Sequence, residues 1–226
     1  MGCDIHDYYE IKNDQGKWEL HNFVPKINDA ETGDLETDYD ALWNHPLHIG
    51  RCYRLFAFLA DVRNGSGFAG CDTGDEVEPI DDPRGVPRDA SGDYLVAVND
   101  WSGDGHSHSF FTAEELVNAD WDQACVERAF IQLSQLEQFK AQGNLDSMSY
   151  CGDVHGANVV KLFMDEAEEM LLRPETRLPG KSYYVRVEYS RPLKEELASY
   201  YTEWLPAVLK LHEDPTRIRF CFFFDN

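Results

Sequence analysis

The stretch Arg217-Ile-Arg-Phe-Cys-Phe-Phe-Phe-Asp-Asn226 is the most strongly β-forming part of this sequence. Its aromatic side chains favour an extended chain, and its apolar run is too long for a solvent-exposed sheet edge. A strand of this composition is buried on both faces. The stretch therefore predicts a strand that is covered on both faces or lies centrally in a sheet.

The beginning of the sequence predicts a hairpin that can pair with this strand. Apolar and polar side chains alternate over residues 3–12 and again over residues 17–24, and Asn13-Asp-Gln-Gly16 between them has the composition of a turn. Pairing across this turn is expected to set two apolar pairs on one face, Ile11 opposite Trp18 and Tyr9 opposite Leu20.

The remaining elements complete an α+β fold. Apolar residues that recur every three or four positions predict helices over residues 51–63, 120–140, 158–173 and 192–205, and a capping box starts another at Thr112. Further strands are expected over residues 94–98 and 182–189. We expect a single domain over residues 1–226, in which the N-terminal hairpin and the C-terminal strands form a mixed sheet packed with several helices. Long acidic loops are expected at about residues 25–45 and 64–92.

The charge of the chain excludes some partners. Its 42 acidic residues against 20 lysines and arginines give a formal net charge of −22, which repels nucleic-acid backbones and acidic membranes. Solubility, adaptation to salt and mimicry of nucleic acid all explain such a charge. The sequence has neither an apolar run long enough to span a membrane nor a signal peptide, so a cytoplasmic protein is expected. Its six scattered cysteines are expected to be free thiols.

The segment Asp104-Gly-His106-Ser-His108-Ser109 concentrates the polar chemistry of the chain. In an extended segment, Asp104, His106 and His108 share one face, where two imidazoles and a carboxylate can hold a divalent cation such as Zn²⁺, Mn²⁺ or Mg²⁺. Two other interpretations remain open, a solvated loop and a set of hydrogen-bonding groups for a ligand, in which Ser109 takes part.

Asp4 and His6 also share a strand face, two residues apart. This pair can add two ligands to a metal site, or Asp4 can orient His6 as a base. The alternative is an ordinary polar face on a half-buried strand.

Three arginines are candidates for binding an anionic ligand. Arg51 lies on the polar stripe of the predicted helix, near Asp61, and can hold a phosphate or a carboxylate or pair with the acidic surface. Arg84-Gly-Val-Pro-Arg88-Asp-Ala-Ser91 is a turn-rich loop that can cover an anion, or a purely structural turn.

The opening Met1-Gly-Cys-Asp-Ile-His6 resembles the start of a group of bacteriophage-encoded proteins of unknown function. Further similar stretches follow in the same order: Arg51-x-Tyr-x-Leu-Phe-Ala57, Leu59-Ala-x-Val-Arg63, Arg84-Gly-x-Pro-x-Asp-x-Ser91, His106-Ser-x-Ser109 before Glu115-Leu116, and Phe224-Asp-Asn226. The resemblance implies no activity. It favours Asp104 and His106 joining Asp4 and His6, and it implies a phage protein in the cytoplasm of an infected host, where interference with host defence is a possible function.

Two functions follow as hypotheses. The first is a metal-dependent hydrolase of a phosphate ester or nucleotide, in which Asp4, His6, Asp104 and His106 hold the metal, Asp89 or Asp61 activates water, and Arg84 or Arg88 neutralises the phosphate. The second is a non-enzymatic anti-defence protein that binds a host protein as an acidic nucleic-acid mimic, or sequesters a nucleotide signal in a pocket that includes Arg51, Arg84 and Arg88.

Overall fold

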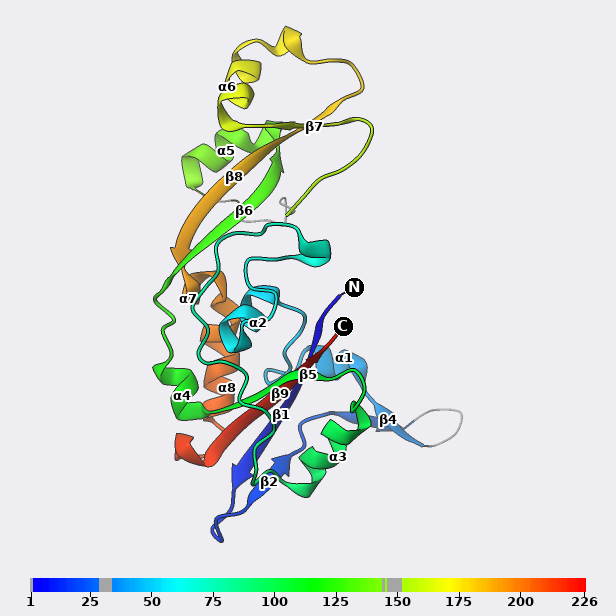
Figure 1. The fold of residues 1–226 in the computed structure, drawn as a ribbon, viewed down its shortest axis with the longest axis vertical. Coiled ribbons are helices and arrows are strands. Elements are labelled where there is room, and N and C mark those ends of the chain that lie inside the picture. The colour runs from blue at the N-terminus through cyan, green and yellow to red at the C-terminus, as the bar shows by residue number, and fades with distance from the viewer. Residues whose placement is uncertain (1, 29–33, 144, 146–151) are drawn as a thin grey trace.

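The computed structural model describes residues 2–28, 34–143, 145 and 152–226 (Figure 1). Its central sheet has the strand order β2 (Trp18–His21), β1 (Asp4–Lys12), β9 (Ile218–Asp225) and β5 (His106–Thr112), and all neighbours are antiparallel. β9 lies between β1 and β5, and its residues from Ile218 to Phe224 are all buried. The prediction of a central, covered strand is therefore confirmed.

Helices cover β9 from both sides because its successive side chains point to opposite faces. On one face, Phe224 contacts Phe56 of α2 (Tyr53–Ala60), and Phe220 contacts Trp204 of the π-helical turn η4 (Tyr200–Trp204). This turn joins α7 (Leu193–Glu196) to α8 (Leu205–Leu209), so Pro206 lies within a continuing helical run that it does not end. The other face of the sheet carries α3 (Gly92–Asp100), whose Tyr94 packs on Tyr8.

The hairpin of β1 and β2 forms as predicted, but the predicted register differs from the observed register by one residue. Tyr9 pairs with His21, Ile11 with Glu19, and Lys12 with Trp18. The cause is the turn: Asn13 N–H donates to the Lys17 carbonyl, which makes Lys17 part of the connection and moves every partner by one position.

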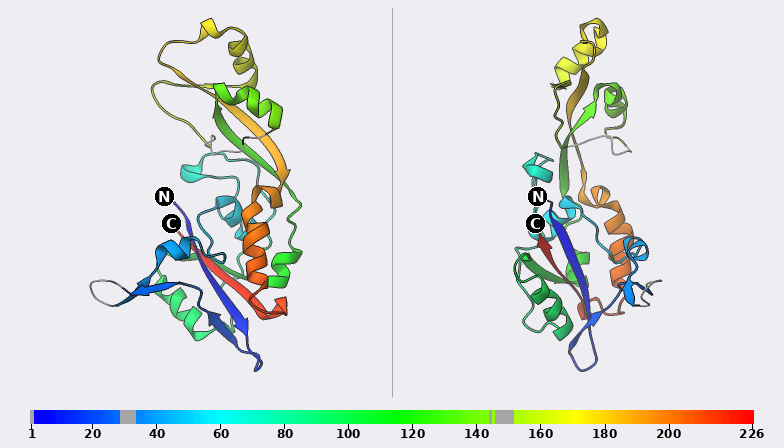
Figure 2. Two further views of the ribbon diagram at one scale, coloured as in Figure 1. Left: turned by 180° about the vertical axis from the view of Figure 1, so that it is seen from behind. Right: turned by 90° about the vertical axis from the view of Figure 1, so that its right-hand side faces the viewer.

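A second sheet stands apart from the first along the long axis of the molecule (Figures 1 and 2). Its order is β6 (Ala124–Gln132), β8 (Ser182–Pro192) and β7 (Val159–Leu162), with β6 antiparallel and β7 parallel to β8. A separate hydrophobic cluster joins it to α5 (Leu136–Gln142) and α6 (Met164–Leu172). The α+β class is confirmed, whereas β8 and β9, expected in one sheet, belong to different sheets.

Three elements differ from the sequence prediction. Residues 94–98 belong to α3 because the Ser91 side chain accepts the N–H of Tyr94 and starts a helix there. Residues 120–140 were predicted as one helix but form β6, the 3₁₀ turn η2 (Leu133–Gln135) and α5. Residues 158–173 were predicted as one helix but begin as β7 before α6.

The remaining elements are short. The acidic segment near residues 25–45 contains β3 (Lys26–Asn28), β4 (Leu35–Thr37) and α1 (Tyr39–Trp43). The predicted loop over residues 64–92 is irregular apart from η1 (Phe68–Gly70), and the capping box at Thr112 starts α4 (Ala113–Asn118) as predicted. Two further turns are η3 (Pro174–Thr176) and η5 (Pro215–Arg217). Within the described ranges, no helix has the length and apolar character needed to cross a membrane.

Candidate functional site

Several predicted site residues meet at the end of β9. Asp4 pairs with Asp225 and His6 with Phe223 across β1 and β9, while His106 pairs with Phe224 across β5 and β9. The two histidine-bearing segments are therefore neighbours on either side of one strand, although they are about 100 residues apart in the sequence.

His6 is held between two aromatic rings. Its ring centroid lies 4.1 Å from that of Trp101 and 4.7 Å from that of Phe223, and its Nε2 is 3.5 Å from Oδ2 of Asp225. The ring is thus packed as an aromatic side chain, with one carboxylate at its edge.

Asp4 is engaged by Arg51. Nε and Nη2 of Arg51 donate to its two carboxylate oxygens at 2.8 and 2.5 Å, and this contact lowers the pKa of Asp4. A predicted metal ligand and a predicted anion-binding residue therefore neutralise each other.

The predicted row of Asp104, His106 and His108 does not form. Asp104 lies in a turn before β5, where its N–H donates to the Trp101 carbonyl, and Ser107 has a φ of +49° at a shift of the strand register. This bulge sends the two imidazoles to opposite faces of the sheet, since His106 stacks on Phe224 and His108 on Phe223. Burial lowers the pKa of both histidines.

No three His, Cys, Asp or Glu side chains among the described residues are grouped as ligands for a metal ion. The divalent cation predicted from the sequence stays a prediction.

The Arg84 loop is bound to the edge of the central sheet. Arg84 pairs with Asp81 and Glu115, each at 2.8 Å, its Nη1 also donates to the Phe110 carbonyl, and Ser109 Oγ accepts the N–H of Arg84. Because these contacts use the guanidinium and the hydroxyl, Arg84 and Ser109 fix the loop to β5.

Asp89 and Ser91 belong to a second structural network. Asp89 accepts from Arg219 Nη1 at 2.7 Å and from the Trp18 indole at 3.0 Å, and Ser91 N–H donates to Glu10 at 2.6 Å. The Ser91 hydroxyl caps α3. Both residues hold the start of α3 against the central sheet.

The other two candidates lie elsewhere. Asp61 ends α2 in a left-handed conformation with a φ of +57° and accepts from the Asn64 side chain, and Arg88 is an exposed side chain without an ion pair to the described residues. The candidate catalytic pair Asp61 and Asp89 is therefore engaged in two separate sets of contacts.

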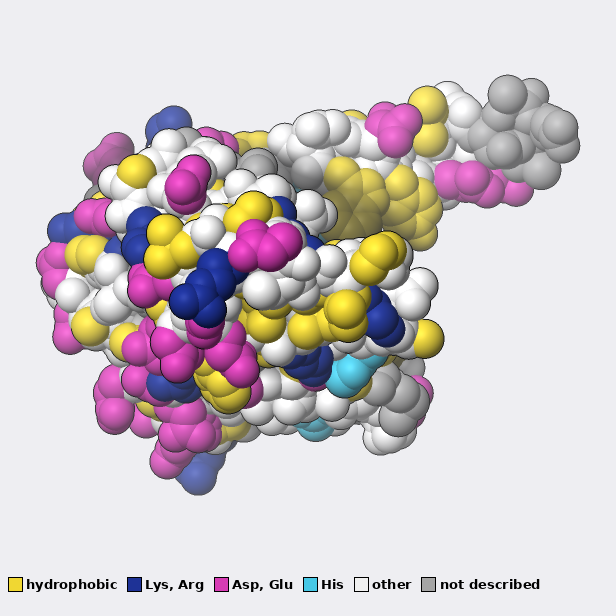
Figure 3. Space-filling model, turned by 90° about the horizontal axis from the view of Figure 1, so that it is seen from above, with side chains coloured by type: hydrophobic (Ala, Val, Ile, Leu, Met, Phe, Trp, Pro, Cys, Tyr) yellow, Lys and Arg dark blue, Asp and Glu magenta, His cyan; other side chains and the backbone are white. Residues whose placement is uncertain are grey.

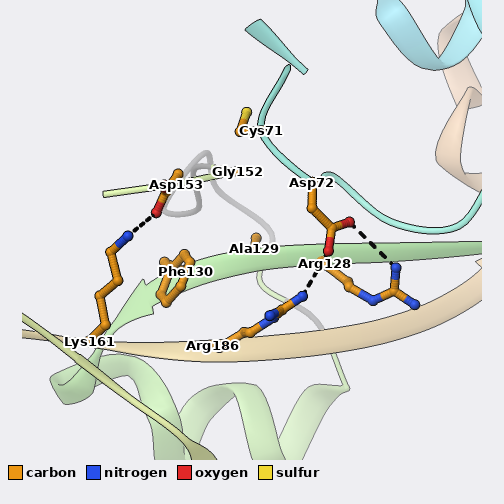
Figure 4. A pocket seen from close by; sticks show the side chains of 9 residues that line it. All are labelled: Cys71, Asp72, Arg128, Ala129, Phe130, Gly152, Asp153, Lys161 and Arg186. Carbon is orange, nitrogen blue, oxygen red and sulfur yellow. Dashed lines mark hydrogen bonds and ion pairs between the residues drawn. The ribbon is translucent and has the colours of Figure 1, made fainter. Parts of the chain in front are cut away.

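A pocket that sequence reasoning missed lies on the open face of the second sheet (Figure 4). It has a volume of about 230 Å³, with β6, β8 and β7 on one side and the segments at residues 71–72 and 152–153 on the other. Three basic side chains and one aromatic ring line it, namely Arg128, Lys161, Arg186 and Phe130.

The cations of this pocket are paired with carboxylates. Asp72 lies between Arg128 and Arg186, at 3.4 and 2.7 Å, and Asp153 contacts Lys161, whose ammonium lies 5.2 Å from the centre of the Phe130 ring. Arg128 also contacts Asp75 and Glu188, and these carboxylates raise its pKa. Lys161 lowers the pKa of Asp153.

The alternation Arg128-x-Phe130-x-Gln132 was the available signal for this face. It was missed because a helical period was assigned to residues 120–140. Comparison of the chain with protein-family models, with curated proteins and with solved structures gives no match.

Proposed function

We propose that this protein binds a small, phosphate-bearing, nucleotide-like molecule in the pocket of the β6–β8–β7 sheet. One observation carries the proposal: in a chain with a net charge of −22, three basic side chains converge on one pocket of about 230 Å³ beside an aromatic ring, where they are paired with Asp72 and Asp153. A ligand of this class corresponds to the nucleotide signal suggested by the sequence, at a different site.

The geometry suits both parts of such a ligand. The guanidinium groups of Arg128 and Arg186 both point toward the carboxylate of Asp72. A planar guanidinium group can donate two parallel hydrogen bonds to two oxygens of one phosphate. Phe130 lies between Lys161 and Arg186 with its ring directed to the pocket, where a base can stack on it (Figure 4).

The carboxylate that now pairs with the two arginines can be replaced by a phosphate group. The side chains of Asp72 and Arg186 are 50% and 45% exposed, and ion pairs between exposed groups contribute only about 0–1 kcal/mol. A phosphate group carries more charge and more acceptor oxygens than a carboxylate. We therefore expect the ligand to displace Asp72 from the two arginines.

The acidity of the whole chain is compatible with this function. A net charge of −22 disfavours the binding of long polyanions, whereas the binding of a small anion depends mainly on the charges close to its site. The proposed function is accordingly the capture of a small nucleotide, without a chemical step.

Titration calorimetry with AMP, ATP and inorganic phosphate tests the proposal. We expect a nucleotide to bind, with an affinity that falls as salt rises, and Arg186→Gln to weaken binding about tenfold or more because a charge-assisted hydrogen bond is lost. Arg173→Gln is the matched control, since Arg173 is an exposed arginine just after α6 that does not line the pocket. Absence of binding at millimolar ligand, or equal affinities of the Arg186→Gln variant and wild type, would contradict the proposal.

A metal-dependent hydrolase is the second candidate, favoured by two histidines on one face of the central sheet, since the rings of His6 and His108 both stack on Phe223. Native mass spectrometry of protein purified without chelator tests it, with His6→Ala and His108→Ala as variants. On this hypothesis a stoichiometric metal is present and both substitutions remove it. A protein that stays metal-free when Mn²⁺ or Zn²⁺ is added contradicts the hypothesis.

A further inference from the structure

A second cleft lies between the segment that follows α1 and the π-helical turn η4. Its volume is about 310 Å³, and its walls include Trp43, His45, His48, Tyr200, Glu203 and Trp204. None of these residues belongs to the phosphate pocket, so the cleft can be considered independently of the proposed function.

Aromatic rings form much of the wall. The Trp43 side chain is 65% exposed and meets the His48 ring edge-on, with 4.9 Å between the ring centroids. Tyr200 and Trp204 also meet edge-on, at 6.4 Å, and the Trp204 indole donates to the Tyr9 hydroxyl at 2.7 Å. Trp204 is therefore fixed, whereas Trp43 presents an exposed ring at the mouth of the cleft.

The cleft is lined by acidic and uncharged side chains. Among the described residues that line it there is no lysine or arginine, and Glu203 supplies an exposed carboxylate. Behind His48 lies Asp7, whose side chain is only 6% exposed and whose Oδ1 is 3.7 Å from His48 Nδ1. Burial lowers the pKa of His45 and so disfavours the charged form of this imidazole.

Two buried atoms of the Asp7 and His48 pair lack partners. Oδ2 of Asp7 and Nε2 of His48 are shielded from solvent and form no hydrogen bond with the described residues. Burial raises the pKa of the Asp7 carboxyl, and a positive charge nearby would offset that cost. The part of the wall formed by His48 is thus polar, and the Asp7 and His48 pair beneath it has two polar atoms without hydrogen-bond partners among the described residues.

We propose that this cleft binds a small organic cation through its alkylammonium group. Aromatic rings attract cations through the negative potential of their faces, and a carboxylate adds a Coulomb attraction. An anionic ligand would meet the Glu203 carboxylate without a compensating lysine or arginine among the described residues that line the cleft, and a neutral apolar ligand would leave that carboxylate without a counterion.

Calorimetry and ¹H–¹⁵N spectra of the tryptophan indoles test the proposal, with choline and tetramethylammonium as probes. The control ligand is 3,3-dimethylbutan-1-ol, which has the shape of choline without its charge. We expect choline to bind and to shift the Trp43 indole signal, and the neutral analogue to bind at least about tenfold more weakly. Equal affinity for the neutral analogue, or no binding of either cation at millimolar concentration, would overturn the proposal.

Two variants locate the site. Trp43→Leu should weaken choline binding by about 2- to 30-fold, and Glu203→Gln should also weaken it. The controls Tyr39→Leu and Glu195→Gln change an exposed aromatic and an exposed acidic residue outside the cleft and should leave the affinity unchanged. Equal loss in the variants and the controls would contradict this location.

The ammonium group can belong to a free metabolite or to a lysine of another protein. Nα-acetyl-lysine methylamide distinguishes these sources: tighter binding of choline supports a free amine, and tighter binding of the lysine derivative supports a side chain. Both results are consistent with the proposed chemistry of the cleft.

Discussion

Arg219 is buried in the central sheet, where it contacts two carboxylates and an aromatic ring. Its side chain is 4% exposed, contacts Glu10 at 2.5 Å and Asp89 at 2.7 Å, and lies 4.2 Å from the centre of a Trp18 ring. Glu10 is itself fully buried. Because both charges have lost water, each depends on the other for its stabilisation.

Removing the charge of Glu10 should therefore destabilise the fold strongly. Glu10→Gln keeps the shape but leaves Arg219 without its buried counterion, and we expect the free energy of unfolding to fall by about 3 kcal/mol. Chemical denaturation measures this. Asp14→Asn is the control, since Asp14 is 98% exposed and its pair with Arg217 should contribute less than about 1 kcal/mol. Similar losses in both variants would contradict the assignment.

The contact between Arg219 and Asp89 should make stability depend on pH. The guanidinium lowers the pKa of Asp89, so this contribution is present above the ordinary carboxyl pKa and is lost as pH falls through the lowered value. Asp89→Asn should be less stable than wild type at pH 7, and the difference should shrink below about pH 4.

Denaturation midpoints between pH 7 and pH 2 measure this difference. The control Asp82→Asn, at an exposed carboxylate without an ion pair to the described residues, should follow wild type throughout. A difference for Asp89→Asn that does not change with pH would show that charge is not its cause.

Among the elements, α4 has the most explicit start signal. The Thr112 hydroxyl accepts the N–H of Glu115 at 3.2 Å, and the Glu115 carboxylate accepts the N–H of Thr112 at 2.7 Å. Arg84 pairs with the same carboxylate and connects the loop before α3 to this cap.

Thr112→Ala should lower the free energy of unfolding by about 1 kcal/mol, because the Glu115 N–H loses its acceptor. Thr112→Ser retains the hydroxyl and should stay close to wild type. Urea denaturation of the three proteins gives the comparison. An equal loss for serine would assign the effect to the methyl group and not to the cap.

The wrongly predicted elements show where local signals conflict. Tyr94-Leu-Val-Ala-Val98 has the composition of a strand, yet only Tyr94 of this run is buried, and the cap by Ser91 sets a helix. In β6 the buried residues Cys125, Ala129 and Ile131 follow a period of two, but Ala129 with later leucines also fits a helical period.

At the scale of the molecule, one acidic segment projects from the body. The arm, which contains the β3–β4 hairpin and leads into α1, projects from the body (Figure 1), and the projecting part carries hydrophobic and acidic side chains side by side (Figure 3). Ile27, Leu35, Tyr39 and Trp43 are each more than half exposed. An apolar surface with an acidic rim is typical of a binding site for a basic partner, as in the hypothesis of a host-binding protein.

Reducing the charge of this arm should abolish such binding. We expect a photo-crosslinker at position 39 to trap one host protein, and the triple variant Asp34→Lys, Glu36→Lys, Asp38→Asn to lose that product because the attraction is reversed. Asparagine at position 38 retains a cap for α1, whose Ala41 N–H is accepted by Asp38. The control is lysine at Glu166, Glu168 and Glu169 of α6. An equal yield of the crosslinked product in wild type and in both triple variants would contradict a role for the arm.

Sequence reasoning was most successful where one segment carries its own signal. An apolar run predicted β9, and apolar residues with a helical period predicted α2. The capping residues Thr112 and Glu115 predicted the start of α4. It was least successful for the sites, because Asp4, Arg84, Asp89 and Ser109 have the composition of functional residues but are used in ion pairs and hydrogen bonds between elements. The pocket at Arg128 and the cleft at Trp43 each combine distant segments.

The sequence by itself determined an α+β fold with a buried final strand, an acidic surface and a hairpin at its start, because these depend on composition and on side-chain periods. The tertiary structure alone decided which sheet each strand joins, the register of the hairpin and which charges are neutralised. Those outcomes depend on contacts across long separations, such as Glu10 with Arg219, and a local pattern does not specify which distant partner a charged side chain will meet.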